Sequence, residues 1–344
     1  MSIERIAVLG TGANGASIGA DLVRAGYDVT YIEQWPAHVE AIRANGLTVV
    51  SQGEKTVTQV RAHHLCEVAE MREDFDLVFM LVKAYDARWA AELIKPRLAP
   101  DGILVGLQNG MMADDIASIV GVERTLGAVI EMASNMFEPG VVNRDTPKET
   151  AWFALGALDG GPQDRAEEVA EILRAAGNVE VVDDILSAKW MKLVVNATEL
   201  VSAGVVDLPM VEAADLPGMR AFMVEAGVEA LEAALDLGHR ALPMFGLTGG
   251  AEDGPQAYVN ALIDAVYEHY AIPTTLTTVH QDWVKGRRSE VEEINGLVVR
   301  ERARKGKSAP ANAVLREIAL GIEAGTETPG EHHLPRLLAA LSTD

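Results

Sequence analysis

The stretch RIAVLGTGANGASIGADLVRAGYDVTYIEQW, residues 5–35, decides the fold of the first half of the chain. A short apolar run leads into three glycines spaced G-x-G-x-x-G, and an amphipathic helical pattern follows. Between a strand and a helix, the first glycine permits a tight bend, the second admits a pyrophosphate, and the third allows close helix packing. The helix start also offers unpaired backbone N–H groups to phosphates. The predicted dinucleotide-binding turn consists of Gly10, Thr11, Gly12, Ala13, Asn14 and Gly15.

Glu33 follows the second predicted strand, residues 28–32, and lies 18 positions after Gly15. An acidic residue about 20 positions beyond the glycines binds the ribose hydroxyls of NAD, and its charge repels the 2′-phosphate of NADP. No lysine or arginine follows Glu33 until Arg43. These residues favour NAD as the cofactor and leave NADP as the alternative. A solvent-exposed Glu33 with no part in cofactor binding is the other interpretation of this position.

The first half of the chain alternates apolar runs with amphipathic segments. Strands are expected at 5–9, 28–32, 47–50, 77–82, 103–107, 125–130 and 152–156. Helices are expected at 14–25, 36–45, 86–95, 112–120 and 164–176. This alternation, with strands that lack polar residues at every second position, is typical of a parallel sheet covered on both faces. We therefore expect an α/β domain of Rossmann type over residues 1–183.

From about residue 184 onwards, only helical patterns are found. Helices are expected at 184–204, 209–237, 254–270, 274–285, 288–306 and 310–323. The second domain, 184–344, is therefore expected to be all-α. Residues 239–256 are rich in Gly and Pro and predict a long loop, which is either a lid over a binding site or a solvated insertion.

The composition of the chain indicates which binding partners and which cellular compartment to expect. The formal net charge of −22 argues against nucleic acid and against an anionic membrane surface as partners. The chain contains one cysteine, Cys66, and no run of eighteen apolar residues, and its N-terminal stretch lacks the apolar region of a signal peptide. A cytoplasmic protein is expected. The adjacent pairs His63-His64 and His332-His333 lack metal-ligand spacing, so no metal site is expected.

Polar residues follow two strands at the edge where ligands bind in open α/β sheets. Lys83 comes after the strand at 77–82, and Asn109 comes after the strand at 103–107. We expect Lys83 to contact cofactor or substrate, although a lysine that reaches out to water is the alternative. Asn109 precedes Gly110, so turn formation explains it equally well.

The helical half opens with SAKWMKLVVNATELVSAGV, residues 187–205. Lys192 and Asn196 are four residues apart and share a helix face that is otherwise apolar, so both need partners. Lys189 is a competing candidate for a functional lysine. Further along, Glu290 is expected to lead a helix, with Glu292 and Glu293 behind it, and spacing alone does not choose among these three acids.

Taken together, these segments resemble the ketopantoate reductase family. The resemblance is carried by GTGANG, LVKAYD, LQNGM, AKWMKLVVNA and RRSEVEEINGLVVRERARKGKSAPAN. The patterns W-x-K-L-x-x-N and S-E-x-x-x-I-N-G are the specific ones. The resemblance implies a Rossmann domain followed by a helical domain, an active site in the cleft between them, and a homodimer. It also implies NAD(P)-dependent hydride transfer to or from a small 2-oxo or 2-hydroxy acid, or a related ketone or alcohol.

By the same resemblance, Lys192 is the general acid that protonates the carbonyl oxygen, and Glu290 is its partner glutamate. Asn196 and Thr278 match positions that contact substrate. The proton transfer assigned to Lys192 would accelerate the reaction by about 10²- to 10⁴-fold. Lys83 and Asn109 match positions where cofactor and substrate meet.

The chain departs from the family pattern at one contact with substrate. Ketopantoate-reducing members commonly have a second asparagine where this chain has Leu200. Glu199, seven residues after Lys192, falls near the same face and is a further candidate contact, although it could equally face solvent. A genuine 2-dehydropantoate 2-reductase is therefore the alternative to a reductase of another 2-oxo acid. A dinucleotide-binding protein without activity is the third possibility, and the set Lys192, Asn196 and Glu290 argues against it.

Overall fold

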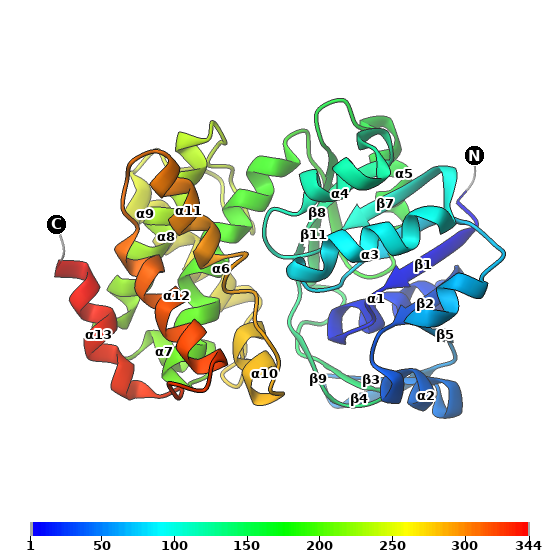
Figure 1. Cartoon of the computed structure of the whole chain (residues 1–344), viewed down its shortest axis with the longest axis horizontal. Coiled ribbons are helices and arrows are strands. Elements are labelled where there is room, and N and C mark those ends of the chain that lie inside the picture. The colour runs from blue at the N-terminus through cyan, green and yellow to red at the C-terminus, as the bar shows by residue number, and fades with distance from the viewer. Residues whose placement is uncertain (1–2, 343–344) are drawn as a thin grey trace. The chain divides into compact units, whose positions relative to one another are not determined.

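The structure is a computed structural model that describes residues 3–342 of the chain. The chain divides into two compact units, one ending at Leu186 and the other beginning at Ser187 (Figure 1). The boundary expected from the sequence lay three residues earlier, at 183.

The first unit is built on an eight-stranded sheet whose strands lie in the order β12-β11-β8-β7-β6-β1-β2-β5. Their bounds are β1 Arg5–Leu9, β2 Asp28–Glu33, β5 Arg61–His64, β6 Phe75–Met80, β7 Leu98–Gly106, β8 Thr125–Glu131, β11 Trp152–Ala157 and β12 Asn178–Val181. The sheet is parallel from β5 to β8, but β11 pairs with β8 in the antiparallel direction. The expected parallel sheet is therefore present from β5 to β8, and β11 departs from it. A parallel neighbour needs a crossover connection, usually a helix, and no helix lies between β8 and β11.

Helices cover both faces of this sheet, as the apolar strands predicted. They are α1 Ala13–Arg24, α2 Pro36–Asn45, α3 Ala87–Ile94, α4 Ala113–Val120 and α5 Gln163–Leu173. Alternate residues of β1 enter different cores: Ile6 and Val8 belong to the cluster that includes α1 and α5, whereas Ala7 and Leu9 belong to the cluster that includes α3 and α4. Because side chains alternate across a strand, this division shows that β1 is buried on both faces.

A second sheet of four strands, in the order β4-β3-β10-β9, lies in the same unit. Its strands are β3 Leu47–Ser51, β4 Glu54–Thr58, β9 Ser134–Glu138 and β10 Val141–Arg144. The strand expected at 47–50 is present as β3, but it belongs to this sheet and not to the main one. The other three strands were not predicted from the sequence, because they are short, carry mostly polar residues and contain no long apolar run.

The second unit is helical, as expected. Its helices are α6 Ile185–Val206, which begins just before the boundary, α7 Met210–Ala214, α8 Met219–Asp236, α9 Pro255–His269, α10 Thr278–Val284, α11 Asn295–Arg304, α12 Pro310–Glu323 and α13 Leu334–Ala339. The single helix expected at 209–237 is broken before Gly218, which has a φ of +83° that few other residues adopt. The helix expected at 288–306 begins only at Asn295. Short 3₁₀ segments occur at 65–70, 84–86, 95–97, 122–124, 331–333 and 340–342.

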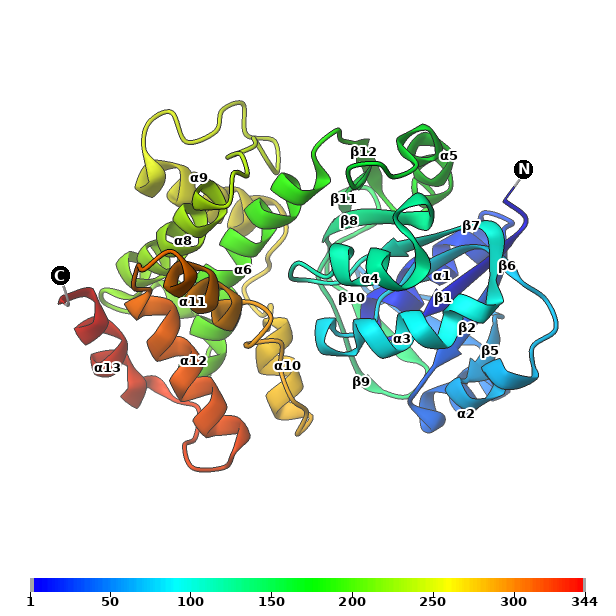
Figure 2. The same ribbon diagram turned by 45° about the horizontal axis from the view of Figure 1, so that its top comes forward.

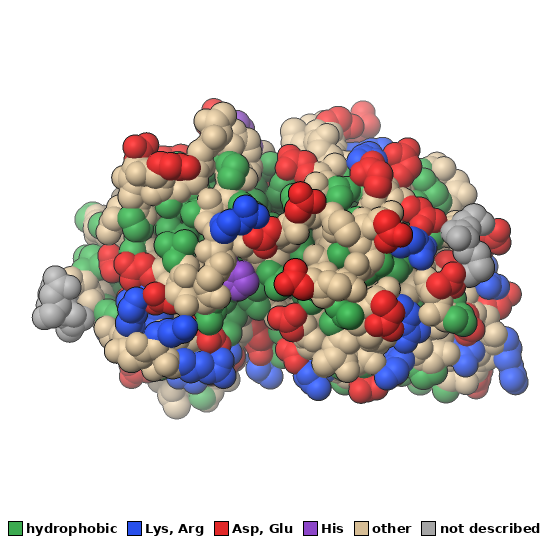
Figure 3. Space-filling model, turned by 90° about the horizontal axis from the view of Figure 1, so that it is seen from above, with side chains coloured by type: hydrophobic (Ala, Val, Ile, Leu, Met, Phe, Trp, Pro, Cys, Tyr) green, Lys and Arg blue, Asp and Glu red, His purple; other side chains and the backbone are tan. Residues whose placement is uncertain are grey.

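Within residues 3–342, no helix is long and apolar enough to cross a bilayer. Acidic side chains appear over both units on the face drawn in Figure 3, interspersed with basic ones.

Candidate functional site

The glycine turn has the geometry that its spacing predicted. A Cβ on Gly10 would lie 2.6 Å from the backbone nitrogen of Val82, and one on Gly15 would lie 2.2 Å from the carbonyl oxygen of Gly10. A Cβ on Gly12 would meet no atom within 4 Å. Gly10 and Gly15 are thus required by packing inside the protein, whereas Gly12 leaves open space beside the backbone. That difference matches a turn that admits a ligand at its second glycine.

Candidate cofactor residues follow one edge of the main sheet. Leu9 of β1 is paired with Ile32 of β2 and with Met80 of β6, and Met80 is paired with Gly106 of β7. These four residues form a row across the carboxyl ends of the strands. Immediately beyond the row come Gly10 and Glu33, and three residues beyond it come Lys83 and Asn109. The register therefore brings the predicted residues of this unit to the edge where dinucleotides bind in such folds.

Glu33 is the last residue of β2, and only 5% of its surface is exposed. One carboxylate oxygen accepts hydrogen bonds from the backbone N–H and the hydroxyl of Thr11, at 2.7 and 3.0 Å. The other accepts from the backbone N–H of Trp35 at 2.8 Å. The interpretation of Glu33 as a solvent-exposed residue is therefore wrong. Hydrogen bonds therefore hold the carboxylate of Glu33 beside Thr11, the residue that follows Gly10 in the turn.

The side chains of the adjoining positions are set by local structure. Lys83 is half-buried and precedes the short 3₁₀ segment that begins at Ala84. Asn109 is half-buried and stands before Gly110, whose φ is +74°. The neighbouring Gln108 donates a hydrogen bond from Nε2 to the carbonyl of Met80 at 2.8 Å, which ties the loop after β7 to the end of β6.

In the second unit, helix α6 carries the predicted catalytic face. At 100° per residue, Lys192, Asn196, Glu199 and Leu200 fall within about one-third of the helix circumference. Asn196, Glu199 and Leu200 are buried, and Lys192 is half-buried. The ammonium of Lys192 lies 5.6 Å from the centre of the Phe245 ring, which is within the range of a cation–π contact. Glu199 thus points into the protein and not into bulk solvent.

The competing lysine, Lys189, lies one turn earlier on the same helix. Only 4% of its surface is exposed, and burial lowers the pKa of its ammonium to about 8. Lys192 is the more accessible of the two. A group that exchanges protons with a substrate must reach it, so exposure distinguishes Lys192 from the buried Lys189.

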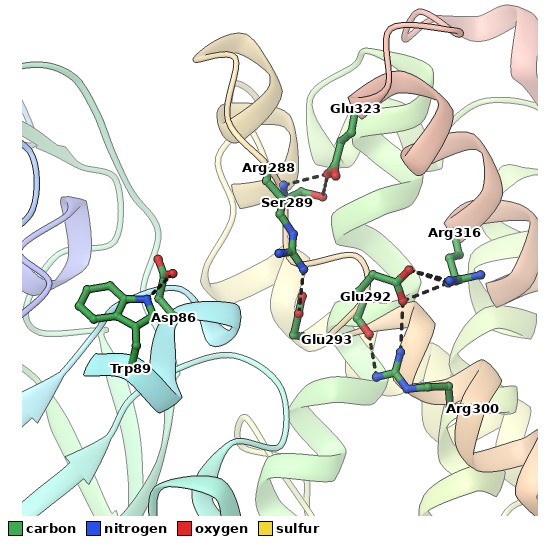
Figure 4. A network of polar contacts seen from close by, with 9 residues as sticks. All are labelled: Asp86, Trp89, Arg288, Ser289, Glu292, Glu293, Arg300, Arg316 and Glu323. Atoms are coloured by element: carbon green, nitrogen blue, oxygen red, sulfur yellow. Dashed lines mark hydrogen bonds and ion pairs between the residues drawn. The ribbon is translucent and has the colours of Figure 1, made fainter. Parts of the chain in front are cut away.

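The structure separates the three acids that spacing could not. Glu292 accepts from Arg316 at 2.6 Å and from Arg300 at 3.1 Å, and its hydrogen bonds with Arg316 lower the pKa of the Glu292 carboxyl (Figure 4). Glu293 lies 3.2 Å from Arg288, and burial raises its pKa. Glu290 is buried, with 3% of its surface exposed. The expectation that Glu290 leads a helix is wrong. Its backbone carbonyl accepts hydrogen bonds from the backbone N–H groups of Glu293 and Ile294, in a turn that precedes α11.

The segment that carries Glu290 is held in place by residues that sequence reasoning missed. Glu323, at the end of α12, accepts hydrogen bonds from the backbone N–H and the hydroxyl of Ser289 at 2.8 and 2.5 Å (Figure 4). It also accepts one from the indole N–H of Trp283 at 3.2 Å. Asn295 donates to the carbonyl of Ala197 on α6 at 3.1 Å. Glu290 is thus bracketed by hydrogen bonds on both sides.

A buried polar chain continues from Asn295 into the core of this unit. Asn295 donates to the side chain of Asn312 at 2.9 Å, and Asn312 donates to Glu229 at 2.7 Å and to the carbonyl of Ala226 at 2.9 Å. Asn295 and Asn312 are fully buried. Burial raises the pKa of the Glu229 carboxyl, and the hydrogen bonds from Asn312 oppose that rise. The asparagines of I-N-G and P-A-N were visible in the sequence, but nothing there showed that they meet.

Thr278, the expected substrate contact, is the first residue of α10 and is half-buried. The preceding Thr277 caps this helix, since its hydroxyl accepts from the backbone N–H of His280. That hydroxyl also donates to the carbonyl of Leu200 at 2.8 Å. The start of α10 is therefore attached to α6 one turn beyond Asn196.

No group of three or more His, Cys, Asp or Glu with metal-binding geometry occurs between residues 3 and 342. The paired histidines have other partners. His64 contacts Glu40 at 2.6 Å, and His333 contacts the carbonyl of Thr328 at 2.9 Å.

Comparison with known proteins agrees with this arrangement. Residues 6–157 match the ketopantoate reductase PanE/ApbA family, and residues 184–323 match the C-terminal domain of that family. A PanE/ApbA family ketopantoate reductase from Ralstonia eutropha JMP134 is 30% identical, with a TM-score of 0.78 over 94% of this chain and 99% of that one. The chain belongs to the ketopantoate reductase family. It is accordingly an oxidoreductase, and the family and fold class inferred from the sequence are confirmed.

Two further relatives show the breadth of the likeness. The 2-dehydropantoate 2-reductase of Archaeoglobus fulgidus is 27% identical over 326 residues, which cover 94% of this chain and all of the relative. A D-mandelate dehydrogenase solved with NADH and anilino(oxo)acetate is 22% identical, with a TM-score of 0.83 over 94% of this chain and 99% of that one. At that identity, the second likeness shows a shared fold.

Proposed function

We propose that this member of the ketopantoate reductase family transfers hydride between a nicotinamide dinucleotide and the carbonyl or hydroxyl carbon of a small 2-oxo or 2-hydroxy acid. The observation that carries the proposal is the helix face of α6, where the accessible Lys192 and the buried Asn196 lie side by side in an apolar surrounding. The fit of the cofactor rests on the open space at Gly12, between two glycines that packing requires.

Each candidate residue has a distinct part in the reaction. When bound, the nicotinamide supplies or accepts the hydride. Lys192 gives its proton to the carbonyl oxygen as negative charge develops there, and it takes the proton back in the oxidative direction. Asn196 donates a hydrogen bond to the substrate, and Glu290 stabilises the ammonium of Lys192. The buried setting of Asn196 and Glu290 supports these assignments, because a fixed dipole or charge acts more strongly away from water.

The remaining assignments concern binding. The backbone of the turn from Gly10 to Gly15 receives the pyrophosphate, and Lys83 and Asn109 lie where the nicotinamide and the substrate would meet. Thr278 and Glu199 are substrate contacts. Glu199 would keep the carboxylate of the substrate away from this part of the face, because like charges repel.

Glu33 favours NAD over NADP in this proposal. Its carboxylate is held at the end of β2 by Thr11 and Trp35, so a 2′-phosphate on the adenosine ribose would meet a fixed negative charge. We expect kcat/KM with NADH to exceed that with NADPH. Glu33→Gln should narrow the gap by raising the value for NADPH. Asp28→Asn, at the exposed start of the same strand, serves as the control. A preference for NADPH in the unaltered protein would contradict this assignment.

The proposed function is tested by steady-state assays of 2-oxo acids with NADH and with NADPH, followed by Lys192→Ala. We expect a fall in kcat of about 10²- to 10⁴-fold for the best substrate, while the dissociation constant for the cofactor stays unchanged. Lys95→Ala, on the surface of the first unit, controls for loss of a lysine. Undiminished turnover by Lys192→Ala would refute the role of this lysine.

A second candidate is reduction of 2-dehydropantoate itself. The match over all of the Archaeoglobus fulgidus 2-dehydropantoate 2-reductase favours it. Growth of a pantothenate-requiring bacterial strain that expresses this chain would support the candidate. Failure of that rescue, together with absent turnover of ketopantoate in vitro, would exclude it.

We also propose a cytoplasmic homodimer, which the family resemblance supports. Sedimentation at micromolar concentration should give about twice the mass of the chain, and a monomer at every concentration would contradict the proposal. Fractionation of the native cells should place the protein with the cytoplasmic enzymes.

A further inference from the structure

The loop between α8 and α9, residues 237–254, is attached to the catalytic helix α6. Figure 2 shows it as the long yellow-green excursion between those two helices. The backbone N–H of Arg240 donates to the hydroxyl of Ser187 at 2.9 Å, and the ring of His239 lies 5.8 Å from that of Trp190. Both partners belong to the first turns of α6. The start of the loop is therefore packed against α6, whereas Thr248, Gly249 and Glu252 further along it are exposed.

Phe245, in the middle of this loop, is the residue placed over Lys192. Only 4% of its surface is exposed, and its ring packs edge-on against Tyr270 with ring centres 5.9 Å apart. Tyr258 of α9 donates a hydrogen bond to the carbonyl of Leu242 in the same loop. Phe245 has a φ of +55°, which bulky side chains rarely adopt. The surrounding contacts thus hold the backbone in an unfavourable conformation that keeps the ring beside the lysine.

The distance between Phe245 and Lys192 places the ring within reach of a bound substrate. A carbonyl oxygen that takes a proton from Nζ lies about 3 Å from it, and the carbonyl carbon is about 1.2 Å further on. The ring centre lies 5.6 Å from the same Nζ. A substituent of the carbonyl carbon that is directed towards the loop would therefore come within reach of the ring.

A 2-oxo acid has two such substituents, the carboxylate and the side chain. The face of an aromatic ring carries partial negative charge, so it repels a carboxylate and accepts an apolar group. The side chain is then the substituent that would lie against Phe245. Leu200, on the same face of α6, is also apolar and offers no hydrogen bond to a hydroxylated side chain.

We propose that Phe245 is a specificity-determining residue and that the enzyme prefers 2-oxo acids whose side chain is apolar over those whose side chain carries a hydroxyl. This inference rests on the proposed function and names its substrate class. Phe245 supplies the apolar surface, and the loop from 237 to 254 holds it in place.

Two substrates that differ by one hydroxyl group test the inference on the unaltered enzyme. Ketopantoate is 4-hydroxy-3,3-dimethyl-2-oxobutyrate, and its deoxy analogue is 3,3-dimethyl-2-oxobutyrate. An apolar pocket should favour the analogue by about 10- to 100-fold in kcat/KM, whereas a site built to bind the hydroxyl would reject it by about 10⁴-fold. A preference for ketopantoate would overturn this inference and leave the proposed function standing. Absence of turnover of any 2-oxo acid with either cofactor would overturn both.

Variants at position 245 then assign the preference to the ring. Phe245→Gly removes the ring and accepts a positive φ, and it should reduce the preference for the deoxy analogue about tenfold. Phe245→Leu keeps an apolar side chain and should retain most of the preference. Phe137→Ala, at an exposed phenylalanine of β9, is the control and should leave the ratio unchanged. An unchanged ratio in Phe245→Gly, with melting temperature confirming that it folds, would show that Phe245 does not set the specificity.

Discussion

Replacing Gly12 and Gly15 by alanine, one at a time, should separate cofactor binding from folding. At Gly12 the added methyl group meets no atom within 4 Å, and the φ of −60° and ψ of −167° suit alanine. The folded protein should therefore lose no more than about 1 kcal/mol, the effect of a poorer residue at the helix start. The methyl group instead occupies the space into which the pyrophosphate would come.

The expected loss of cofactor affinity follows from the hydrogen bonds at stake. A hydrogen bond between a backbone N–H and a charged phosphate contributes about 1.5–3 kcal/mol. Loss of one such bond in Gly12→Ala raises the dissociation constant for NADH about 10- to 150-fold. Isothermal titration calorimetry with NADH measures this change directly.

Gly15→Ala should have the opposite profile. Its methyl group would lie 2.2 Å from the carbonyl oxygen of Gly10, whereas real Cβ contacts stay beyond 3.0 Å. Overpacking against backbone costs about 3 kcal/mol, and the better helix propensity of alanine returns about 1 kcal/mol. The net loss of about 2 kcal/mol should lower the melting temperature by about 4–8 °C.

The two variants together test whether the pyrophosphate approaches Gly12 and whether Gly15 packs closely against Gly10. If Gly12→Ala bound NADH as tightly as the unaltered protein, the pyrophosphate would not approach this part of the turn. If Gly15→Ala melted at or above the temperature of the unaltered protein, the close contact between Gly10 and Gly15 would be absent in solution.

Three further predictions concern buried polar groups. Because burial lowers the pKa of Lys189 from 10.5 to about 8, the unfolded chain binds more protons between these pH values, and the unfolding free energy rises with pH there by up to about 3 kcal/mol. Lys189→Met should remove that rise in urea titrations, and an equal slope in both proteins would contradict it. Asn312→Ala, which breaks the chain between Asn295 and Glu229, should cost about 2–4 kcal/mol in the same assay. Asp21→Asn leaves the guanidinium of Arg144 buried without its carboxylate and should cost about 3–5 kcal/mol, and a loss below 1 kcal/mol would refute the importance of this pair.

The two-unit fold could be read from the sequence because its signals are local. A buried parallel strand is a continuous apolar run, and RIAVL and LVFML are such runs. The glycines of the turn are needed for contacts a few residues away, so their spacing is visible along the chain. By contrast, β10 depends on pairing with β3, which lies far earlier in the chain, and β4 and β9 contain exposed polar residues that give no such run.

The functional residues divide in the same way. The residue types at the turn and at Glu33 predicted dinucleotide binding, and the family resemblance that W-x-K-L-x-x-N helps to carry implied an oxidoreductase with Lys192 as its general acid. Spacing could not distinguish Glu290 from its acidic neighbours, and only the family resemblance selected it. The arginines that pair with Glu292 come from α11 and α12.

The sequence by itself therefore determined the fold class and the chemistry, because both depend on residue types and on short spacings. Only the tertiary structure decided which groups surround Lys192. The ring of Phe245 comes from a loop more than fifty residues away, and nothing local to either residue encodes the contact. Packing of that loop onto α6 brings them together, and the preference for one substrate over another is expected to depend on that packing.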